Sequence, residues 1–249
     1  LLATIVKKTC PLTGGRRDAT LCMGVLHVMN KVKITVLKTT LDTELAAEYG
    51  VEVYPHYLDL CDSKSVTKCV EDVIAHFGKI DILVNSGGTG GSGDPATMTD
   101  EQWAHVVDTD LTGLFYLCRD VARLSMIPNN YGRIVNVSSI HGFVSRKNVW
   151  TAPYCASKGG VHMMTKAMAN DWGKYNITVN CIAPGYFPTE LTEKFIDSDA
   201  FVQLHKDRCP KERHGILGEM DGLCVYFAAP CCTYTTGQVV AVDGGWTCN

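Results

Sequence analysis

The chain has 249 residues, of which 46% are hydrophobic and 20% are charged, and its formal net charge is -3. This length suits one α/β domain with a large buried core, and the composition excludes disordered, collagen-like and coiled-coil proteins. Because the charge is nearly balanced, no broad cationic surface is available and nucleic acid is not expected as a partner. The apolar stretches are too short for a membrane span or a signal peptide, which predicts a soluble, cytoplasmic protein without a membrane partner.

The 12 cysteines are scattered along the sequence and none of them forms a Cys-x-x-Cys pair. Such spacing does not suit a zinc site or a disulfide framework. We therefore expect no metal, and we expect most of the thiols to behave as small buried apolar groups.

Short β-branched runs alternate with segments of helical spacing along most of the chain. The runs predict buried strands at 34–37, 80–84, 134–137, 177–180 and 239–242. The helical spacing predicts helices at about 19–30, 41–49, 64–78, 100–126, 153–173 and 218–229. This alternation predicts one α/β domain over residues 1–249, a Rossmann-type doubly wound parallel sheet with helices on both faces. The segment 186–215 is the least regular and is interpreted as a lid over the substrate, with a loosely ordered insertion as the alternative.

Ligands of open parallel sheets bind beyond the carboxyl ends of the strands. The residues that follow the predicted strands are Lys38, the run 85–88 (Asn-Ser-Gly-Gly), Ser138 with Ser139, and the run 183–185 (Ala-Pro-Gly). We therefore expect the functional site at these segments, along one edge of the sheet.

Tyr154 and Lys158 lie four residues apart in the helix predicted at 153–173, so they share one helical face. An ammonium group one turn from a phenol favours the phenolate, so this tyrosine can exchange a proton with an alcohol or a carbonyl. Ser139, which follows a predicted strand, can bind the same oxygen by donating a hydrogen bond. A Tyr-x-x-x-Lys pair is common by chance, and it gains weight here from Ser139 and from the glycine-containing runs on either side.

Together these motifs resemble those of the short-chain dehydrogenase/reductase family over nearly the whole chain. The run 85–88 is similar to the family's Asn-Asn-Ala-Gly, and Ser139, Tyr154 and Lys158 match its catalytic serine, tyrosine and lysine. The resemblance implies an NAD(P)-dependent enzyme that transfers a hydride between a nicotinamide and a carbonyl or secondary alcohol. It also implies a homotetramer built through the helices at 100–126 and 153–173.

The same resemblance implies which residues bind the cofactor. They are Gly14, Arg16, Arg17, Ala19, Lys38, Asp59, Asn85, Gly87, Tyr154, Lys158, Pro184, Gly185, Phe187 and Thr189. An acidic residue at the end of the second strand selects NAD, so Lys38 at that position, with Arg17 across the loop, favours NADP and leaves NAD as the alternative. Both side chains also suit an ordinary exposed surface.

The phosphate loop departs from the family pattern. It reads Thr13-Gly14-Gly15-Arg16-Arg17-Asp18-Ala19-Thr20 and keeps only the first glycine of Thr-Gly-x-x-x-Gly-x-Gly. The carboxylate of Asp18 stands at the start of the next predicted helix, where it competes with a pyrophosphate. Three interpretations stay open: an altered site that works, impaired cofactor binding, or misidentified residues in this part of the sequence.

Asp110 stands where the family usually has an asparagine, and we include it among the catalytic residues. An aspartate beside Lys158 is expected to pair with it and to cancel part of its effect on Tyr154.

The run 182–192 resembles the gluconate 5-dehydrogenase group, which implies a keto-sugar acid, a polyol or a ketose as the small-molecule substrate. We expect His141, Arg146 and Tyr186 to contact it, although Arg146 and its neighbour Lys147 also suit a solvated loop. Two alternatives remain: a 3-oxoacyl thioester (acyl-carrier-protein) reductase, which differs mainly in the lid, and a catalytically silent binding or scaffold protein on the same fold.

Overall fold

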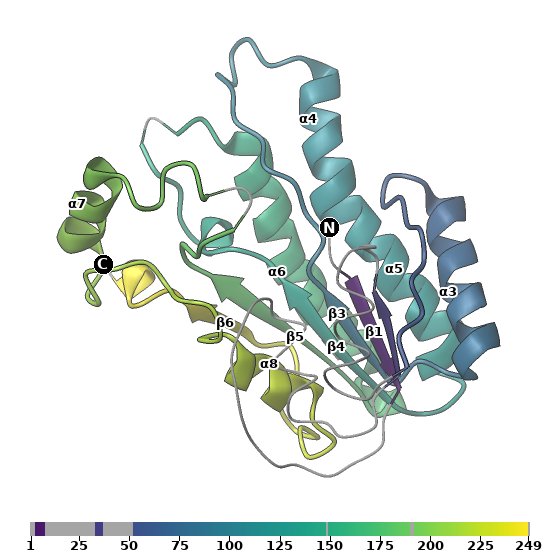
Figure 1. The fold of residues 1–249 in the computed structure, drawn as a ribbon. Coiled ribbons are helices and arrows are strands. Elements are labelled where there is room, and N and C mark those ends of the chain that lie inside the picture. The colour runs from purple at the N-terminus through teal and green to yellow at the C-terminus, as the bar shows by residue number, and fades with distance from the viewer. Residues whose placement is uncertain (1–2, 8–32, 37–51, 148, 190–191, 249) are drawn as a thin grey trace.

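Strands and helices alternate through the computed structural model, which describes residues 3–7, 33–36, 52–147, 149–189 and 192–248 (Figure 1). The strands are β1 (Ala3–Lys7), β2 (Lys33–Val36), β3 (Ile82–Asn85), β4 (Gly132–Val137), β5 (Ile177–Pro184) and β6 (Val239–Val242). The helices are α3 (Ser63–Phe77), α4 (Asp100–Val107), α5 (Gly113–Val121), α6 (Ala152–Trp172), α7 (Asp199–Arg208) and α8 (Asp221–Ala228). The helices predicted at 19–30 and 41–49 lie outside the described residues.

The strands form one sheet in the order β2-β1-β3-β4-β5-β6. Strands β3 to β6 pair in parallel, as predicted. Strand β1, however, runs antiparallel to both of its neighbours, so the expectation of a wholly parallel sheet is corrected at this strand. A strand pattern shows which residues alternate between two faces, but the alternation reads the same in both chain directions, so it does not determine the direction of the strand.

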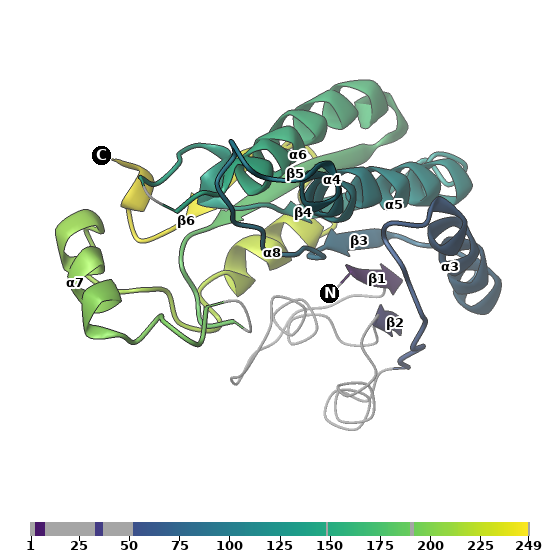
Figure 2. The ribbon, with the colours of Figure 1, turned by 90° about the horizontal axis from the view of Figure 1, so that it is seen from above.

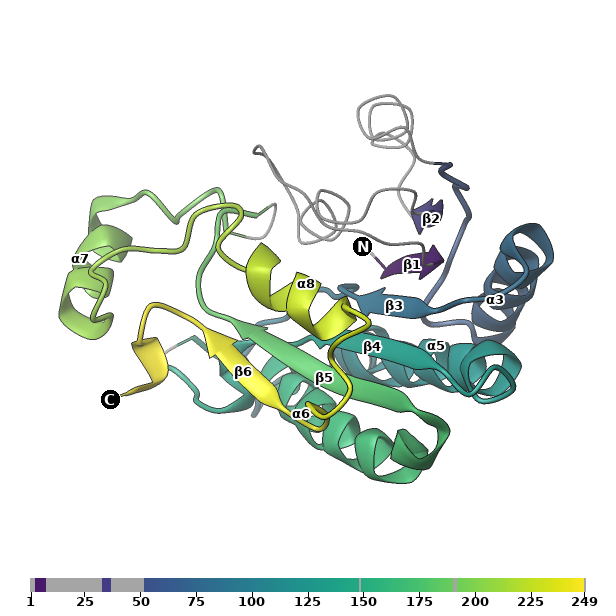
Figure 3. The ribbon, with the colours of Figure 1, turned by 90° about the horizontal axis from the view of Figure 1, so that it is seen from below.

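Helices cover both faces of the sheet, which confirms the predicted layers. Leu83 and Ile134 pack with α3, α5 and α6 on one face (Figure 2). Their chain neighbours Ile82 and Val135 pack with α8 on the opposite face (Figure 3). Because successive side chains of a strand point to opposite faces, burial on both faces explains the uninterrupted apolar runs in the sequence.

Local signals determine where the helices begin. Thr99 and Gln102 form a capping box at the start of α4, in which each side chain accepts a hydrogen bond from the other residue's backbone N–H. Pro153 occupies the first turn of α6, where a missing N–H costs nothing. Among the described residues, no helix combines the length and the apolarity needed to cross a bilayer.

The helix predicted over 100–126 is interrupted by two π turns, Asp108–Thr112 and Ala122–Met126. At the first of them, Gly113 N–H donates to the Asp108 carbonyl, five residues back. A π turn changes the direction in which the side chains around it point, and such turns recur at functional sites. Here the turn contains Asp110, whose side chain is fully buried.

Gly113 allows α5 to pack closely against the residue Leu60. A Cβ at position 113 would lie 2.6 Å from the Leu60 carbonyl oxygen, which belongs to the backbone and has little room to move. We expect Gly113→Ala to lower the free energy of unfolding by about 1–3 kcal/mol, as overpacked substitutions do. The matched control is Gly222→Ala on α8, where a Cβ meets nothing within 4 Å and stability should rise by up to about 1 kcal/mol. Urea denaturation measures the free energy of unfolding of both variants. Equal changes in the two variants would contradict the packing argument.

Candidate active site

A cavity of about 740 Å³ opens beyond the carboxyl ends of β3, β4 and β5, at the edge where the sequence places the site. Residues 86–92 after β3 and residues 137–141 at the end of β4 form two of its walls. Thr151, Tyr154 and Lys158 of the α6 region form a third wall. Segments distant in the sequence therefore meet around one space.

Helix α6 presents Tyr154 and Lys158 to this cavity side by side. The Nζ atom of Lys158 lies 5.3 Å from the centroid of the Tyr154 ring, as the four-residue spacing predicts. Lys158 is only 4% exposed, so its ammonium group acts on its neighbours with little screening by water.

Asp110 forms a buried ion pair with Lys158, with Oδ2 lying 3.2 Å from Nζ. The backbone N–H of Thr89 donates to the other carboxylate oxygen, Oδ1, over 2.6 Å. Burial raises the pKa of Asp110, and the positive charge of Lys158 opposes that rise. The carboxylate therefore connects the glycine-rich run after β3 to α6, and this confirms the pairing expected from the sequence.

Gly88 allows this run to pass directly over the ammonium group. A Cβ at position 88 would lie 3.1 Å from Lys158 Nζ and 3.4 Å from Asp110 Oδ1. A side chain there would fill the space beside Lys158, so the glycine leaves room for a ligand to approach it.

Ser139 begins a short 3₁₀ turn, Ile140–Gly142, beyond β4. Its Oγ accepts a hydrogen bond from the His141 backbone N–H over 3.1 Å, and it lines the cavity. Because the oxygen is the acceptor in that bond, the hydroxyl proton can point to a ligand. Ser138 connects the same strand end to α6, since its Oγ donates to the Lys158 carbonyl over 2.9 Å.

The three residues expected at the substrate meet on one wall of the cavity. The Tyr186 hydroxyl lies 3.2 Å from His141 Nε2 and 3.4 Å from the NH1 nitrogen of Arg146. Burial lowers the pKa of His141 and raises the pKa of Tyr186, so both are uncharged near neutral pH. Arg146 therefore supplies the charge, and no carboxylate of the described residues forms an ion pair with it. Lys147 is exposed and does not line the cavity.

The segment expected as a lid contributes an aromatic wall. Phe187, Phe195 and Phe201 line the cavity, and α7, which carries Phe201, lies apart from the sheet (Figure 1). Tyr186 packs edge-on against Phe201 and Trp246, with both centroid distances at 5.0 Å. This side of the cavity is therefore apolar.

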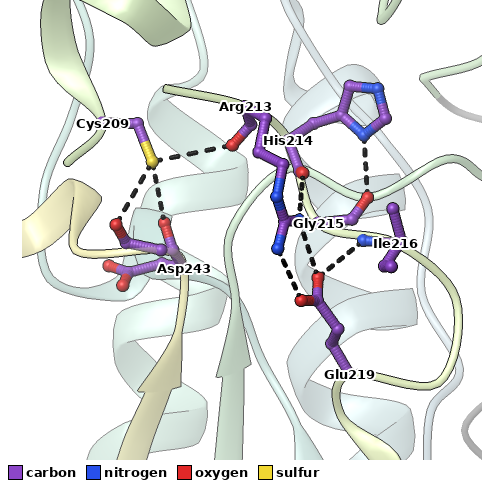
Figure 4. Close-up of polar contacts among 8 residues, drawn as sticks. Cys209, Arg213, His214, Gly215, Ile216, Glu219 and Asp243 are labelled. Atoms are coloured by element: carbon purple, nitrogen blue, oxygen red, sulfur yellow. Dashed lines mark hydrogen bonds and ion pairs between the residues drawn. The ribbon is translucent and has the colours of Figure 1, made fainter. Parts of the chain in front are cut away.

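The far end of that segment is attached to the turn after β6 (Figure 4). Cys209 Sγ lies 3.5 Å and 3.4 Å from the carbonyl oxygens of Asp243 and Gly244. Arg213 donates to both carboxylate oxygens of Glu219, and this hydrogen bonding lowers the pKa of Glu219 to about 2. A smaller cavity of about 290 Å³ lies here and shares Tyr186 with the larger one. These contacts connect the end of the segment to the turn after β6 and to the residues before α8.

The predicted cofactor residues divide into three groups. Those that line the cavity are Gly87, Tyr154, Lys158, Gly185, Phe187 and Thr189. Three others, Asn85, Asp59 and Pro184, do not line it. The remaining ones, Gly14, Arg16, Arg17, Ala19 and Lys38, lie outside the described residues, as does the altered loop.

Asn85 and Asp59 form hydrogen bonds within the protein. The Asn85 side chain is buried and donates weakly to the Leu114 carbonyl and to Asn136 Oδ1, both at 3.4 Å. Asp59 is exposed before α3, where its Oδ1 accepts from the Cys61 backbone N–H. Neither side chain lines the cavity, and their role at the cofactor stays a prediction.

Sequence reasoning missed Thr89, Phe195 and Phe201. Thr89 had a signal, because the glycine-containing run continues beyond Gly88 and such runs come close to ligands and partners. The two phenylalanines had no sequence signal, because the segment around them lacks the helical or strand periodicity that would predict which side chains point inward.

A comparison with known proteins identifies the family. The family profile described as Enoyl-(Acyl carrier protein) reductase matches residues 30–247. The chain belongs to the short-chain dehydrogenase/reductase family. It is therefore an NAD(P)-dependent oxidoreductase, which does not support the silent-scaffold alternative.

Sugar-acid dehydrogenases are among its relatives. Gluconate 5-dehydrogenase of Gluconobacter oxydans (strain 621H) is 34% identical over 198 residues, which are 80% of this chain and 76% of the relative. A 3-oxoacyl-[acyl-carrier-protein] reductase of Thermotoga maritima is 33% identical over 96% of this chain and 97% of its own. The crystal structure of a gluconate 5-dehydrogenase from Burkholderia cenocepacia J2315, in complex with NADP and tartrate, is 30% identical, with a TM-score of 0.84 over 93% of this chain and 92% of that one.

A buried histidine behind the site makes stability depend on pH. His162 is 5% exposed, and burial lowers its pKa to about 4. Between the ordinary histidine pKa of about 6.5 and that value, the unfolded chain binds a proton that the folded chain does not. The contribution of His162 therefore lowers the free energy of unfolding as pH falls, by up to about 1.4 kcal/mol per pH unit.

Urea denaturation from pH 7 to pH 4 checks this, with His162→Gln as the comparison. The variant should lose less stability than the unchanged protein over the same range. The stability of the variant should still fall with pH to some extent, because burial also lowers the pKa of His141 and His205. Parallel curves for the two proteins would contradict the assignment to His162.

Proposed function

We propose that the protein reduces the keto group of a small hydroxylated carboxylic acid, such as a keto-gluconate, with NADPH, and oxidises the matching alcohol with NADP. The observation that carries this proposal is the Arg146 guanidinium, which faces the same cavity as Ser139, Tyr154 and Lys158 without a carboxylate partner among the described residues.

The cavity suits a nicotinamide cofactor. Gly88 leaves space beside the Lys158 ammonium group, and Gly87 and Gly185 line the wall without side chains. Tyr154 and Lys158 would bind the nicotinamide ribose, and the bound nicotinamide supplies or accepts the hydride. The preference for NADP rests on Lys38 and Arg17 in the sequence, and the NADP in the Burkholderia cenocepacia structure supports it.

In this proposal, residues of the chain itself bind the substrate oxygen and transfer the proton. Ser139 donates a hydrogen bond to the substrate oxygen, which fixes the oxygen and stabilises negative charge on it. Tyr154 gives a proton to that oxygen in reduction and removes one in oxidation. Lys158 lies beside the Tyr154 ring, and Asp110 positions Lys158 through the buried ion pair and partly neutralises its charge.

Arg146, His141 and Tyr186 form the acid-binding wall of the proposed substrate site. The guanidinium can bind a carboxylate through two parallel hydrogen bonds, and the two neutral groups can bind hydroxyls. Relatives named for gluconate, for 2-dehydro-3-deoxy-D-gluconate and for galactitol support a substrate of this class.

A 3-oxoacyl thioester is the second candidate substrate. The aromatic wall of Phe187, Phe195 and Phe201 favours it, because an acyl chain would bury apolar surface there. The relative from Thermotoga maritima supports it as well. Measuring kcat/KM for 5-keto-D-gluconate and for a 3-oxoacyl thioester with NADPH decides between the two candidates.

Replacing Tyr154 with phenylalanine removes the proton donor but keeps the ring. We expect turnover of 5-keto-D-gluconate to fall by at least about 100-fold, which is the low end for loss of a positioned acid. NADPH affinity, followed by the fluorescence of the four tryptophans, should stay within about threefold. A variant that keeps its turnover would remove Tyr154 from the reaction.

Arg146→Ala tests the acid-binding wall. Loss of a charge-assisted hydrogen bond should raise KM for 5-keto-D-gluconate by about 10- to 100-fold. Lys147→Ala is the matched control, because Lys147 is the exposed neighbour in the same loop and should leave KM unchanged. An equal rise in KM for a neutral ketose would show that Arg146 does not recognise the carboxylate.

Asp110→Asn tests the partner of Lys158. Without the carboxylate, the full ammonium charge acts on Tyr154, so the acidic limb of the pH–rate profile for alcohol oxidation should move to lower pH. Initial rates with gluconate and NADP from pH 5 to pH 10 measure the limb. An unchanged limb would refute the role of the ion pair in setting it.

A further inference from the structure

The geometry points to His162 as a positioning residue for Ser139, because its buried imidazole lies against the turn that carries that serine. The inference rests on the proposed function, in which Ser139 binds the substrate oxygen. His162 does not line the cavity, so it would act only through Ser139 and not by contact with the substrate.

The imidazole fills the space beside the Ser139 turn. His162 lies four residues after Lys158, and so on the same face of α6. A Cβ at Gly142, the last residue of the turn, would lie 2.6 Å from Nε2 of His162. The ring of Phe143, the residue that follows the turn, also packs on the imidazole, with the two centroids 4.3 Å apart. The ring and the turn therefore support each other directly.

A polar contact reinforces this packing. The Ser139 backbone acts on the imidazole and favours a higher pKa, while Nε2 is buried without a hydrogen-bond partner among the described residues. Burial of the ring, followed by the positive charges of Lys166 and Lys158, opposes protonation and lowers the pKa. His162 is therefore a neutral side chain of α6 that packs against the turn.

The turn contains three residues, Ile140–Gly142, and other contacts also hold it. Gly142 N–H donates to the Ser139 carbonyl over 3.0 Å, and the His141 side chain lies 3.2 Å from the Tyr186 hydroxyl. His162 adds support from the α6 side. An aliphatic side chain in place of His162 would remove the polar contact and leave part of the space empty. A shift of Ser139 Oγ by about 1 Å is enough to slow a positioned reaction by up to about 100-fold.

A double-mutant cycle tests the inference, with His162→Leu, Ser139→Ala and the variant that carries both changes. Single-turnover reduction of 5-keto-D-gluconate by NADPH gives the rate, and tryptophan fluorescence gives NADPH affinity as the check on folding. We expect His162→Leu to lower the rate about 10-fold with unchanged NADPH affinity, and to cause no further loss when Ser139 is already alanine. His162→Gln, whose amide can still donate to a backbone carbonyl, should stay within about threefold of the unchanged protein. Met163→Ala, at the exposed neighbour on α6, is the matched control and should have no effect.

The outcomes distinguish failure of the His162 inference from failure of the proposed function. A normal rate for His162→Leu overturns the inference, and so does a 10-fold loss that persists in the Ser139→Ala background, since His162 would then act by another route. If Ser139→Ala itself is as fast as the unchanged protein, the proposed function fails first. A slow Ser139→Ala together with equally slow Leu and Gln variants of His162 overturns only the role of the polar contact with Ser139.

Discussion

The buried ion pair between Lys158 and Asp110 is the interaction on which the site depends. It joins α6, which also carries Tyr154, to the π turn after α4 and, through Thr89 N–H, to the glycine-rich run after β3. Removing one partner would leave a buried charge without compensation, which is costly. The same pair limits the charge that Lys158 can exert on Tyr154. The π turn that places Asp110 therefore joins three segments around the cavity.

The two sides of the cavity differ in chemistry. Arg146, His141 and Tyr186 form a polar wall with one net positive charge, whereas Phe187, Phe195 and Phe201 form an aromatic wall. Tyr186 belongs to both, because its hydroxyl contacts Arg146 while its ring packs against Phe201 and Trp246. A substrate with an anionic end and a less polar body suits this division.

Patterns that depend on local geometry were predictable from the sequence. The apolar runs located β3 to β6, and the four-residue spacing placed Tyr154 and Lys158 on one face, because burial and helical periodicity act over a few residues. The ion pair between Asp110 and Lys158 was predictable because the two side chains carry opposite charges. The direction of β1, the aromatic wall and the position of His162 did not follow, since each depends on contacts between segments distant in the sequence. The tetramer and the lid stay predictions.

Transfer of a labelled hydride tests the central claim most directly. NADPH carrying deuterium at both C4 positions is incubated with 5-keto-D-gluconate and the protein, and the product is analysed by mass spectrometry. The account predicts a product with one deuterium on the carbon that bore the keto group, while the hydroxyl proton comes from the protein and water. A product without the label, or no consumption of NADPH in the presence of saturating keto-acid, would contradict it.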